Sequence, residues 1–281
     1  KPGEKIAILT PVYYPFKKTI EACGCTTVTS SLINQEGVYS INFDDLEAKL
    51  ADPEVKMLIF CSPHNPTGRV WEQWEIKKAM EIYKKHDVYV VSDEIWSDLL
   101  LNGHKHTPTQ SVSEDAKQRT VALYAPSKTF NLAGLIGSYH IIYNDWLRER
   151  ILKESSLSHY NSMNLLSMYA LIGAYKPEGY EWVDELKEVL SGNVNYACDY
   201  IEKHFEGVNV SRPEGTYMLF LDCTEWCKKH GRTITELQAA GIEVGVIWQD
   251  GVAFHGPCHI RMNLALPLSR IKEAFDRLDK Y

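Results

Sequence analysis

Asn65, Asp93 and Lys128 each follow a short apolar stretch of chain, and their side chains could act together in one reaction. The apolar stretches are residues 57–61, 87–91 and 120–124. A lysine amine can bind a carbonyl compound covalently, a carboxylate can hold a positively charged group, and an amide can donate a hydrogen bond. Each residue alone has an ordinary structural explanation, namely a turn, a helix cap or a solvated charge. The three together, in this order, indicate a reaction centre.

The stretches that carry these residues have the pattern of strands in a parallel sheet. Six strands are predicted in the first two thirds of the chain, over residues 5–10, 26–29, 57–61, 87–92, 120–124 and 138–143. Between two of them, residues 76–83 have the spacing of an amphipathic helix. Strands that alternate with helices favour crossover connections and a mainly parallel sheet. Because ligands bind at the carboxyl ends of parallel strands, we expect Asn65, Asp93 and Lys128 to meet at one edge.

The last third of the chain has a different pattern and predicts a second, smaller α+β domain. One long helix is predicted over residues 180–205, with Gly192 as a local weakness. A final helix should follow Pro267, and short strands are expected over residues 217–221, 242–246 and 259–264. We therefore expect a large α/β domain over residues 1–175, and an interdomain helix with a C-terminal small domain over residues 176–281.

The composition excludes several classes of protein. The chain has 281 residues, and 30 basic against 37 acidic residues give a net charge of −7 and a pI of 5.8. This balance disfavours a nucleic-acid or anionic-membrane surface as the main function. No apolar run approaches the roughly 18–20 residues that a membrane span needs. A chain of this length is expected to form about two domains.

The cysteine and histidine residues do not predict a metal site. Seven cysteines are scattered along the chain, which indicates a reduced protein in the cytoplasm. The two closely spaced pairs, within residues 23–25 and 223–227, lack the spacing of a zinc site. His104 and His106 form a His-x-His pair in a polar, turn-like stretch, and we expect a solvated loop there.

Four motifs resemble the fold type I pyridoxal-phosphate enzymes, the aspartate aminotransferase superfamily. They are residues 64–68 (His-Asn-Pro-Thr-Gly), 92–95 (Ser-Asp-Glu-Ile), 127–135 and 259–263. The segments 11–16 and 125–128 are similar in particular to the cystathionine β-lyase branch, often called MalY/PatB, whose members are carbon–sulfur lyases. The resemblance runs from Lys1 to the C-terminus. It implies that a substantial N-terminal part, with a glycine-containing loop for the cofactor phosphate, precedes Lys1.

The resemblance implies a site for pyridoxal 5′-phosphate. Lys128 would form the Schiff base with the cofactor aldehyde and later act as the base for the substrate α-proton. Asp93 would face the ring nitrogen, and Asn65 would donate a hydrogen bond to the ring hydroxyl. Tyr13 would stack on the ring face. Ser127 would help to hold the phosphate.

The resemblance also assigns residues to an amino-acid substrate and includes departures from many aminotransferases. Tyr14 and Arg261 would contact the substrate, and the guanidinium of Arg261 would clamp its carboxylate. Trp96 stands where many aminotransferases have a tyrosine beside the cofactor ring, and its indole N–H would donate to the ring oxygen instead. Ile136 replaces an arginine, and Ala125 replaces a serine, that often hold the phosphate. These departures favour the lyase branch over a typical aminotransferase.

Simpler interpretations of single residues stay open when the residues are taken alone. Tyr13 and Tyr14 could be plain core aromatics. Arg261 could be an exposed charge on a strand, and Ser127 could be a turn hydroxyl.

The function that the resemblance implies is a pyridoxal-phosphate-dependent carbon–sulfur β-lyase. Such an enzyme would cleave cystathionine or a related cysteine S-conjugate to a thiol, pyruvate and ammonia. The first alternative is an aminotransferase on the same scaffold. An alternative of another class is a regulatory binding protein that restrains a transcription regulator.

The expected partners are a small amino-acid substrate and a second copy of the chain. A homodimer is expected because the active site of this fold usually lies at a subunit interface. The aromatic-rich residues 160–175 could supply apolar surface for that interface. No nucleic-acid or membrane partner is expected.

Overall fold

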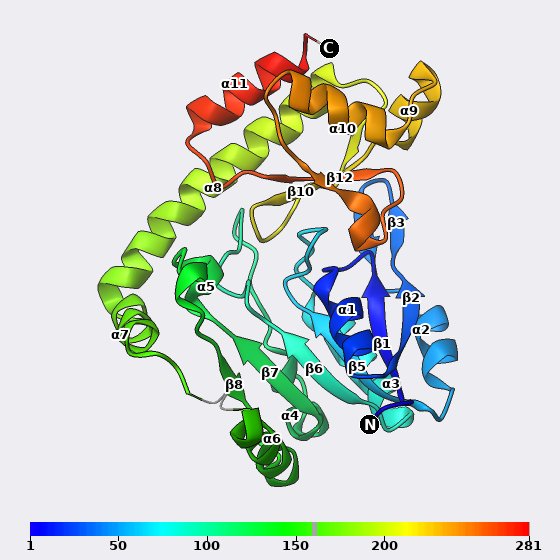
Figure 1. Cartoon of the computed structure of the whole chain (residues 1–281), viewed down its shortest axis with the longest axis vertical. Helices are drawn as coiled ribbons and strands as arrows, with labels where there is room; N and C mark the ends of the chain where they lie inside the picture. Colours follow the sequence, from blue (N-terminus) through cyan, green and yellow to red (C-terminus); the bar gives the residue numbers. More distant parts are fainter. Residues whose placement is uncertain (159–161, 281) are drawn as a thin grey trace.

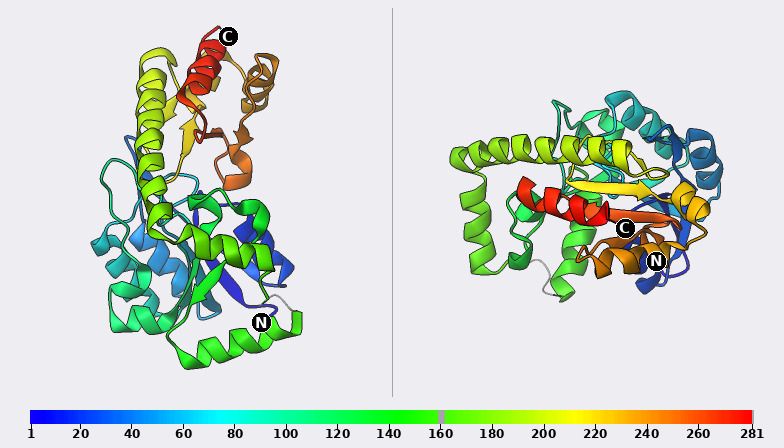
Figure 2. Two further views of the ribbon diagram at one scale, coloured as in Figure 1. Left: turned by 90° about the vertical axis from the view of Figure 1, so that its left-hand side faces the viewer. Right: turned by 90° about the horizontal axis from the view of Figure 1, so that it is seen from above.

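A computed structural model describes residues 1–158 and 162–280 of the chain. Its main parts are a six-stranded sheet, in the lower half of Figure 1, and a four-stranded sheet above it. The long helix α8 (Pro177–His204) runs beside both parts, as the two views of Figure 2 show. The active-site residues predicted from the sequence are therefore divided between two sheets.

The six-stranded sheet has the order β2-β1-β5-β6-β7-β8. The pairs from β2 to β7 are parallel, and β8 pairs antiparallel with β7 at one edge. All six predicted strands are confirmed, and so is the mainly parallel sheet. The strands are β1 (Lys5–Thr10), β2 (Thr26–Ser31), β5 (Val55–Cys61), β6 (Tyr89–Asp93), β7 (Thr120–Tyr124) and β8 (Tyr139–Ile141).

Helices pack on this sheet through their apolar sides. The helix α3 (Gln73–Lys85) buries Ile76, Ala79, Met80 and Tyr83, which are the residues that the sequence spacing placed on one side. The remaining elements of this part are α1 (Pro15–Ala22), the hairpin β3 (Ile33–Gln35) and β4 (Val38–Ser40), α2 (Phe43–Leu50), a 3-10 turn at Thr109–Ser111, α4 (Glu114–Arg119), α5 (Pro126–Thr129), a 3-10 turn at Ala133–Leu135, α6 (Asp145–Ser158) and α7 (Leu165–Ala174).

The four-stranded sheet is antiparallel and has the order β11-β12-β10-β9. Its core contacts α8 and α11 through Val194, Ile201, Leu219, Ile260 and Phe275, each at most 1% exposed. The elements here are β9 (Asn209–Val210), β10 (Met218–Asp222), α9 (Thr224–His230), α10 (Ile234–Glu243), β11 (Gln249–Asp250), a 3-10 turn at Gly251–Phe254, β12 (His259–Asn263) and α11 (Leu268–Leu278).

Most sequence predictions for this part are confirmed. The long helix continues through Gly192 without interruption, because several of its side chains are anchored in the core. The predicted strands over residues 217–221 and 259–264 and the final helix after Pro267 are present. The domain boundary between residues 175 and 176 stays a prediction. None of the helices in the described residues is long and apolar enough to cross a membrane.

The strand predicted over residues 242–246 is wrong. Thr233 and Glu236 form a capping box that begins α10, and this helix continues to Glu243. Gly245 then has a left-handed backbone with φ of +79°, so the chain turns where the strand was expected. The alternating apolar residues of the segment come from a helix end and the turn after it. Ile242 is accordingly exposed, whereas Val246 is buried.

A close backbone contact at Gly68 holds the loop after β5 against the segment that leads to β10. The carbonyl of Gly68 accepts hydrogen bonds from the backbone N–H groups of Glu214 and Gly215, each at 2.9 Å. Gly68 has φ of +72°, and a Cβ atom there would lie 2.3 Å from Cβ of Pro213. Arg69 also forms an ion pair with Glu214. Only a residue without a side chain allows this close approach.

We predict that Gly68→Ala strongly destabilises the protein, because it adds both backbone strain and a clash. Left-handed strain costs about 1–2 kcal/mol and overpacking adds about 1–3 kcal/mol. Gly103→Ala is the matched control, since Gly103 has φ of +81° and nothing within 4 Å of its Cβ position. Urea unfolding of both variants measures the two costs. Equal losses of stability would show that the contact with Pro213 contributes nothing.

Candidate active site

The sheet brings Asn65, Asp93 and Lys128 to its carboxyl edge. Asp93 is the last residue of β6, and in the register it lies beside Cys61, the last residue of β5. Asn65 follows four residues after Cys61, and Lys128 lies in α5, directly after β7. The positive charge of Lys128 is close enough to act on the carboxyl group of Asp93. The predicted convergence at one edge is therefore present.

Asp93 is a buried carboxyl group with 8% of its surface exposed. Its Oδ1 atom accepts a hydrogen bond from the backbone N–H of Ile95 at 3.2 Å. Burial raises the pKa of Asp93 to about 6, and the neighbouring charge of Glu94 acts in the same direction. The Ile95 N–H and the Lys128 amine act against this rise. Asp93 can therefore exchange a proton near neutral pH and would bind a positively charged group strongly.

Lys128 lies beside a pair of packed aromatic side chains. Its Nζ atom is 5.7 Å from the ring centroid of Trp96, which is buried, and the ring of Tyr217 meets Trp96 edge-on at 4.8 Å. The next residue, Thr129, donates its hydroxyl to Asp98 at 2.9 Å and so anchors the short helix. The amine is thus held on a fixed turn with an aromatic surface next to it.

Arg261 reaches from the four-stranded sheet to the edge of the six-stranded sheet. Its Nη1 donates to Oδ1 of Asn65 at 2.8 Å, and its Nη2 donates to Gln249, its register neighbour on β11. The guanidinium carbon lies 4.5 Å from the ring centroid of Phe254. Its Nε is buried without a hydrogen-bond partner among the described residues. Burial lowers the pKa of Arg261, and the unpaired N–H is a donor that an incoming carboxylate could use.

Three tyrosines surround the guanidinium of Arg261. Tyr13, Tyr14 and Tyr217 all lie close enough for their hydroxyl groups to act on its charge. The rings of Tyr13 and Tyr14 are 5.5 Å apart, and Tyr14 meets Phe254 edge-on at 5.4 Å. Tyr13 and Tyr14 are half-buried rather than part of a sealed core. Burial raises the pKa of Tyr13, so its phenol stays neutral near pH 7.

The structure places the remaining predicted residue, Ser127, in the first turn of α5. Its backbone carbonyl accepts from the N–H of Leu132 at 3.1 Å. Ser127 is half-buried next to Lys128, and its role toward a phosphate stays a prediction. The roles assigned to the other site residues also stay predictions, although the structure brings these residues together.

The expectation that His106 lies in a solvated loop is wrong. His104 is exposed, but His106 is largely buried, and its Nε2 lies 2.7 Å from Oε2 of Glu94. The partner is 12 residues away along the chain, so no local pattern could reveal the contact. Sequence analysis also missed Gln249 and Tyr217, which reach Arg261 only because the sheets pair and pack as they do.

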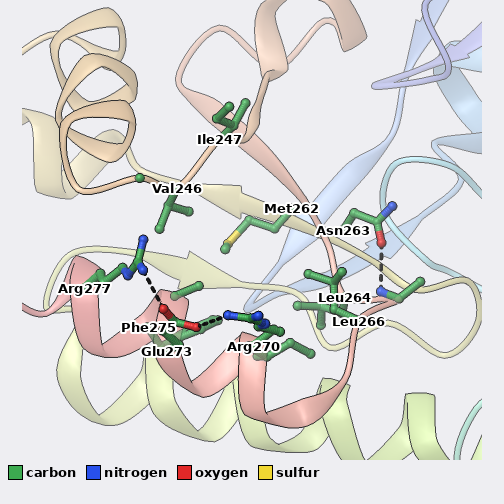
Figure 3. A pocket seen from close by; sticks show the side chains of 14 residues that line it. Val246, Ile247, Met262, Asn263, Leu264, Leu266, Arg270, Glu273, Phe275 and Arg277 are labelled. Carbon is green, nitrogen blue, oxygen red and sulfur yellow. Dashed lines mark hydrogen bonds and ion pairs between the residues drawn. The ribbon is translucent and has the colours of Figure 1, made fainter.

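A separate hollow of about 480 Å³ lies between α11 and the segment 245–247. Figure 3 shows its apolar floor, with Met262 and Leu264 from β12 and the loop after it, and an ion-paired rim in which Glu273 joins Arg270 and Arg277. Met262 faces away from the side of β12 that carries Arg261, because side chains alternate along a strand. This hollow therefore belongs to a different face from the candidate site.

The donor set fits pyridoxal phosphate, the cofactor predicted from the sequence. Lys128 supplies an amine, the buried Asp93 supplies a partner for a protonated ring nitrogen, and aromatic rings line the space beside them. The side-chain oxygen of Asn65 accepts a hydrogen bond from Arg261, because a guanidinium can only donate. The Nδ2 group of Asn65 therefore remains a donor for another partner. The Nε of Arg261, which no other described residue contacts by a hydrogen bond, suits the carboxylate of an amino-acid substrate.

Comparison with known proteins gives concordant matches over nearly the whole chain. The family described as "Aminotransferase class I and II" matches residues 1–278. The chain is 35% identical over 281 residues to cystathionine beta-lyase PatB of Bacillus subtilis (strain 168), covering 99% of this chain and 71% of that protein. It is 27% identical over 284 residues to an aspartate aminotransferase of Bacillus sp. (strain YM-2), covering 99% and 70%.

A solved structure shows the same fold with a ligand in place. The PLP-bound C-S lyase from Staphylococcus hominis superposes with a TM-score of 0.90 at 33% sequence identity, covering 99% of this chain and 70% of that chain.

The raised pKa of Asp93 makes a prediction about stability. Because the folded state holds the Asp93 proton up to about pH 6, stability falls as the pH rises from the usual aspartate pKa of 3.8 to about 6. A shift of about two units corresponds to about 3 kcal/mol. Without cofactor, Asp93→Asn should therefore become more stable than the wild type by up to about that amount above pH 6.

Urea unfolding of the cofactor-free protein between pH 4 and pH 8 measures this difference. Asp276→Asn, at an exposed position of α11, is the control and should show a much smaller change of the difference with pH. A stability difference for Asp93→Asn that stays constant across the range would contradict the assignment of a buried, proton-holding carboxyl group.

Proposed function

This chain belongs to the aminotransferase class I and II family, and we propose that within the family it is a pyridoxal-phosphate-dependent carbon–sulfur β-lyase. The observation that carries the proposal is the meeting of Lys128, Asp93 and Arg261 at one site, in a chain that is 35% identical to a cystathionine β-lyase. Family and cofactor agree with the sequence-based expectation of a pyridoxal-phosphate enzyme.

The cofactor, when bound, supplies an electron-withdrawing ring that stabilises negative charge on the substrate α-carbon. Four residues of the chain would hold its ring and aldehyde. Lys128 would bind the aldehyde carbon through Nζ, Asp93 would keep a proton on the ring nitrogen, Asn65 would donate from Nδ2 to the ring hydroxyl, and Tyr13 would cover one ring face. The raised pKa of Asp93 supports its assignment, since such a buried carboxyl binds a positive partner strongly.

Arg261 would hold the substrate carboxylate and thereby orient the substrate so that its α-hydrogen faces the Lys128 amine. Two of its nitrogens are already held by Asn65 and Gln249, so the guanidinium has a set orientation before substrate arrives. The Lys128 amine would then accept the α-proton at Nζ.

The bond that breaks next is the one between the β-carbon and sulfur. The thiolate leaves with the bonding electrons and takes up a proton, and water converts the remaining three-carbon fragment to pyruvate and ammonia. Trp96 and Tyr217 offer aromatic surface beside Lys128, and thioether sulfur packs favourably against aromatic rings. This supports a cysteine S-conjugate, such as cystathionine, as the substrate.

The alternative is an aminotransferase, which would use nearly the same residues. The aspartate aminotransferase of Bacillus sp. (strain YM-2) is less similar, at 27% identity against 35% for PatB. The tryptophan at position 96 also departs from the tyrosine that many aminotransferases carry there. Both observations support the lyase.

We also propose that the working unit is a homodimer. The helix α7 exposes Leu165, Leu166 and Tyr169, with 65%, 71% and 67% of their surfaces accessible. Residues 160 and 161, at the start of the aromatic-rich segment predicted to supply the interface, lie outside the described residues. A second copy would remove this apolar surface from water. Sedimentation of the active protein as a monomer at micromolar concentration would refute the proposal.

The function is tested by identifying the products. We predict that the protein with pyridoxal phosphate converts cystathionine to a thiol and pyruvate, and that Lys128→Ala lowers the rate by at least about 100-fold because the base is lost. Lys153→Ala, at an exposed position of α6, is the control and should keep wild-type activity. Formation of a keto acid from cystathionine only when a 2-oxo acid is present, without release of thiol, would identify an aminotransferase instead.

A further inference from the structure

Next to Asp93 in the sequence is Glu94, a fully buried carboxylate that contacts four hydrogen-bonding groups. Glu94 has no exposed surface. Its Oε1 accepts from the hydroxyl of Ser92 at 2.9 Å and from the backbone N–H of Thr109 at 3.0 Å. Its Oε2 accepts from Tyr124 at 2.6 Å and from Nε2 of His106 at 2.7 Å.

These contacts keep Glu94 negatively charged. Burial works to raise the pKa of Glu94, but the hydrogen bonds from His106, Tyr124 and Thr109 hold it below its usual value. An ionised carboxylate can only accept, so the proton between the two side chains is carried by Nε2 of His106. The chain therefore maintains a fixed negative charge inside the large sheet.

The contacts also tie together the two strands that carry the chemistry. Glu94 directly follows Asp93, and Tyr124 is the last residue of β7, four residues before Lys128. A hydrogen bond between Glu94 and Tyr124 therefore spaces the ends of β6 and β7. The backbone also joins the strands here, because the N–H of Glu94 donates to the carbonyl of Leu123 at 3.0 Å. The side-chain contact with Tyr124 therefore adds to a pairing that the backbone of β6 and β7 already makes.

We propose that Glu94 is a positioning residue of the active site, which holds Asp93 and Lys128 at their spacing and, through its fixed charge, makes Asp93 favour a proton or a cationic ring. The inference rests on the proposed function for the identity of that ring, and on the geometry of the chain for the rest. The negative charge of Glu94, the next residue, acts on Asp93 and opposes a second negative charge there.

Among the described residues that act on Asp93, Glu94 is the one that carries a negative charge. Lys128 from α5 is positive, while Tyr13 from the loop after β1 and Cys61 from the end of β5 also act on Asp93. Burial raises the pKa of both Tyr13 and Cys61, so these two groups are neutral around pH 7. A change of charge at Glu94 should therefore be felt directly at Asp93.

The test compares Glu94→Gln, which removes the charge and keeps the shape, with Tyr124→Phe, which keeps the charge and removes one hydrogen bond. For each protein, urea unfolding with and without Asp93→Asn gives the stability penalty that Asp93 causes at each pH. This penalty stops growing at the pH midpoint where Asp93 ionises in the folded protein. This measurement uses cofactor-free protein and does not depend on catalysis. We expect the midpoint to move to lower pH in Glu94→Gln, and to stay or rise in Tyr124→Phe.

The binding of pyridoxal phosphate, followed by quenching of tryptophan fluorescence, is the second readout. We expect Glu94→Gln to weaken binding several-fold near pH 7, where the wild type still binds. An unchanged midpoint in Glu94→Gln, or an equal downward shift in both variants, would overturn the proposal and leave Glu94 a merely structural group.

Two further outcomes are decisive. If Glu94→Gln does not fold, a lower midpoint in Tyr124→Phe overturns the proposal, and an equal or higher one supports it. If the wild type fails to bind pyridoxal phosphate, the proposed function fails, while the midpoint comparison still decides the role of Glu94.

Discussion

The candidate site depends on one hydrogen bond between two sheets, from Nη1 of Arg261 to Oδ1 of Asn65. Arg261 belongs to β12 of the small antiparallel sheet, and Asn65 belongs to the loop at the carboxyl edge of the large parallel sheet. Their 2.8 Å contact exists only if the two sheets keep their relative position. The close approach at Gly68 and the ion pair between Arg69 and Glu214 hold that position near the same loop.

Several buried polar groups lie at this edge, among them Asn65, Asp93 and Glu94. Asp93 is held in an environment that opposes its charge, which lowers stability at neutral pH but prepares the carboxyl for a cationic partner. Arg261 carries a buried N–H with no partner in the described part of the chain, which is costly until a carboxylate arrives. Glu94, in contrast, is fully satisfied and supports its neighbours from behind. The site thus combines two incompletely paired groups with one rigid anchor.

The parts of the fold and site that could be predicted are those that depend on local pattern. The apolar strands and the amphipathic helix α3 follow from periodicity, and parallel strands bring Asn65, Asp93 and Lys128 to one edge for geometric reasons. The segment 242–246 misled the prediction because a helix end and a turn can mimic strand alternation. The contact between His106 and Glu94, and those of Gln249 and Tyr217 with Arg261, are formed by packing between distant segments. No local signal marks them.

The account is tested most directly at Arg261, because this residue joins the two sheets at the point where substrate would bind. The measurement is the kcat/KM of Arg261→Lys with cystathionine, together with the absorbance of the bound cofactor. A lysine cannot reproduce two parallel charge-assisted hydrogen bonds, which are worth about 1.5–3 kcal/mol. The account predicts a loss of roughly 10- to 150-fold in kcat/KM with unchanged cofactor absorbance. A kcat/KM within about twofold of the wild type would show that Arg261 is an ordinary strand charge and would contradict the account.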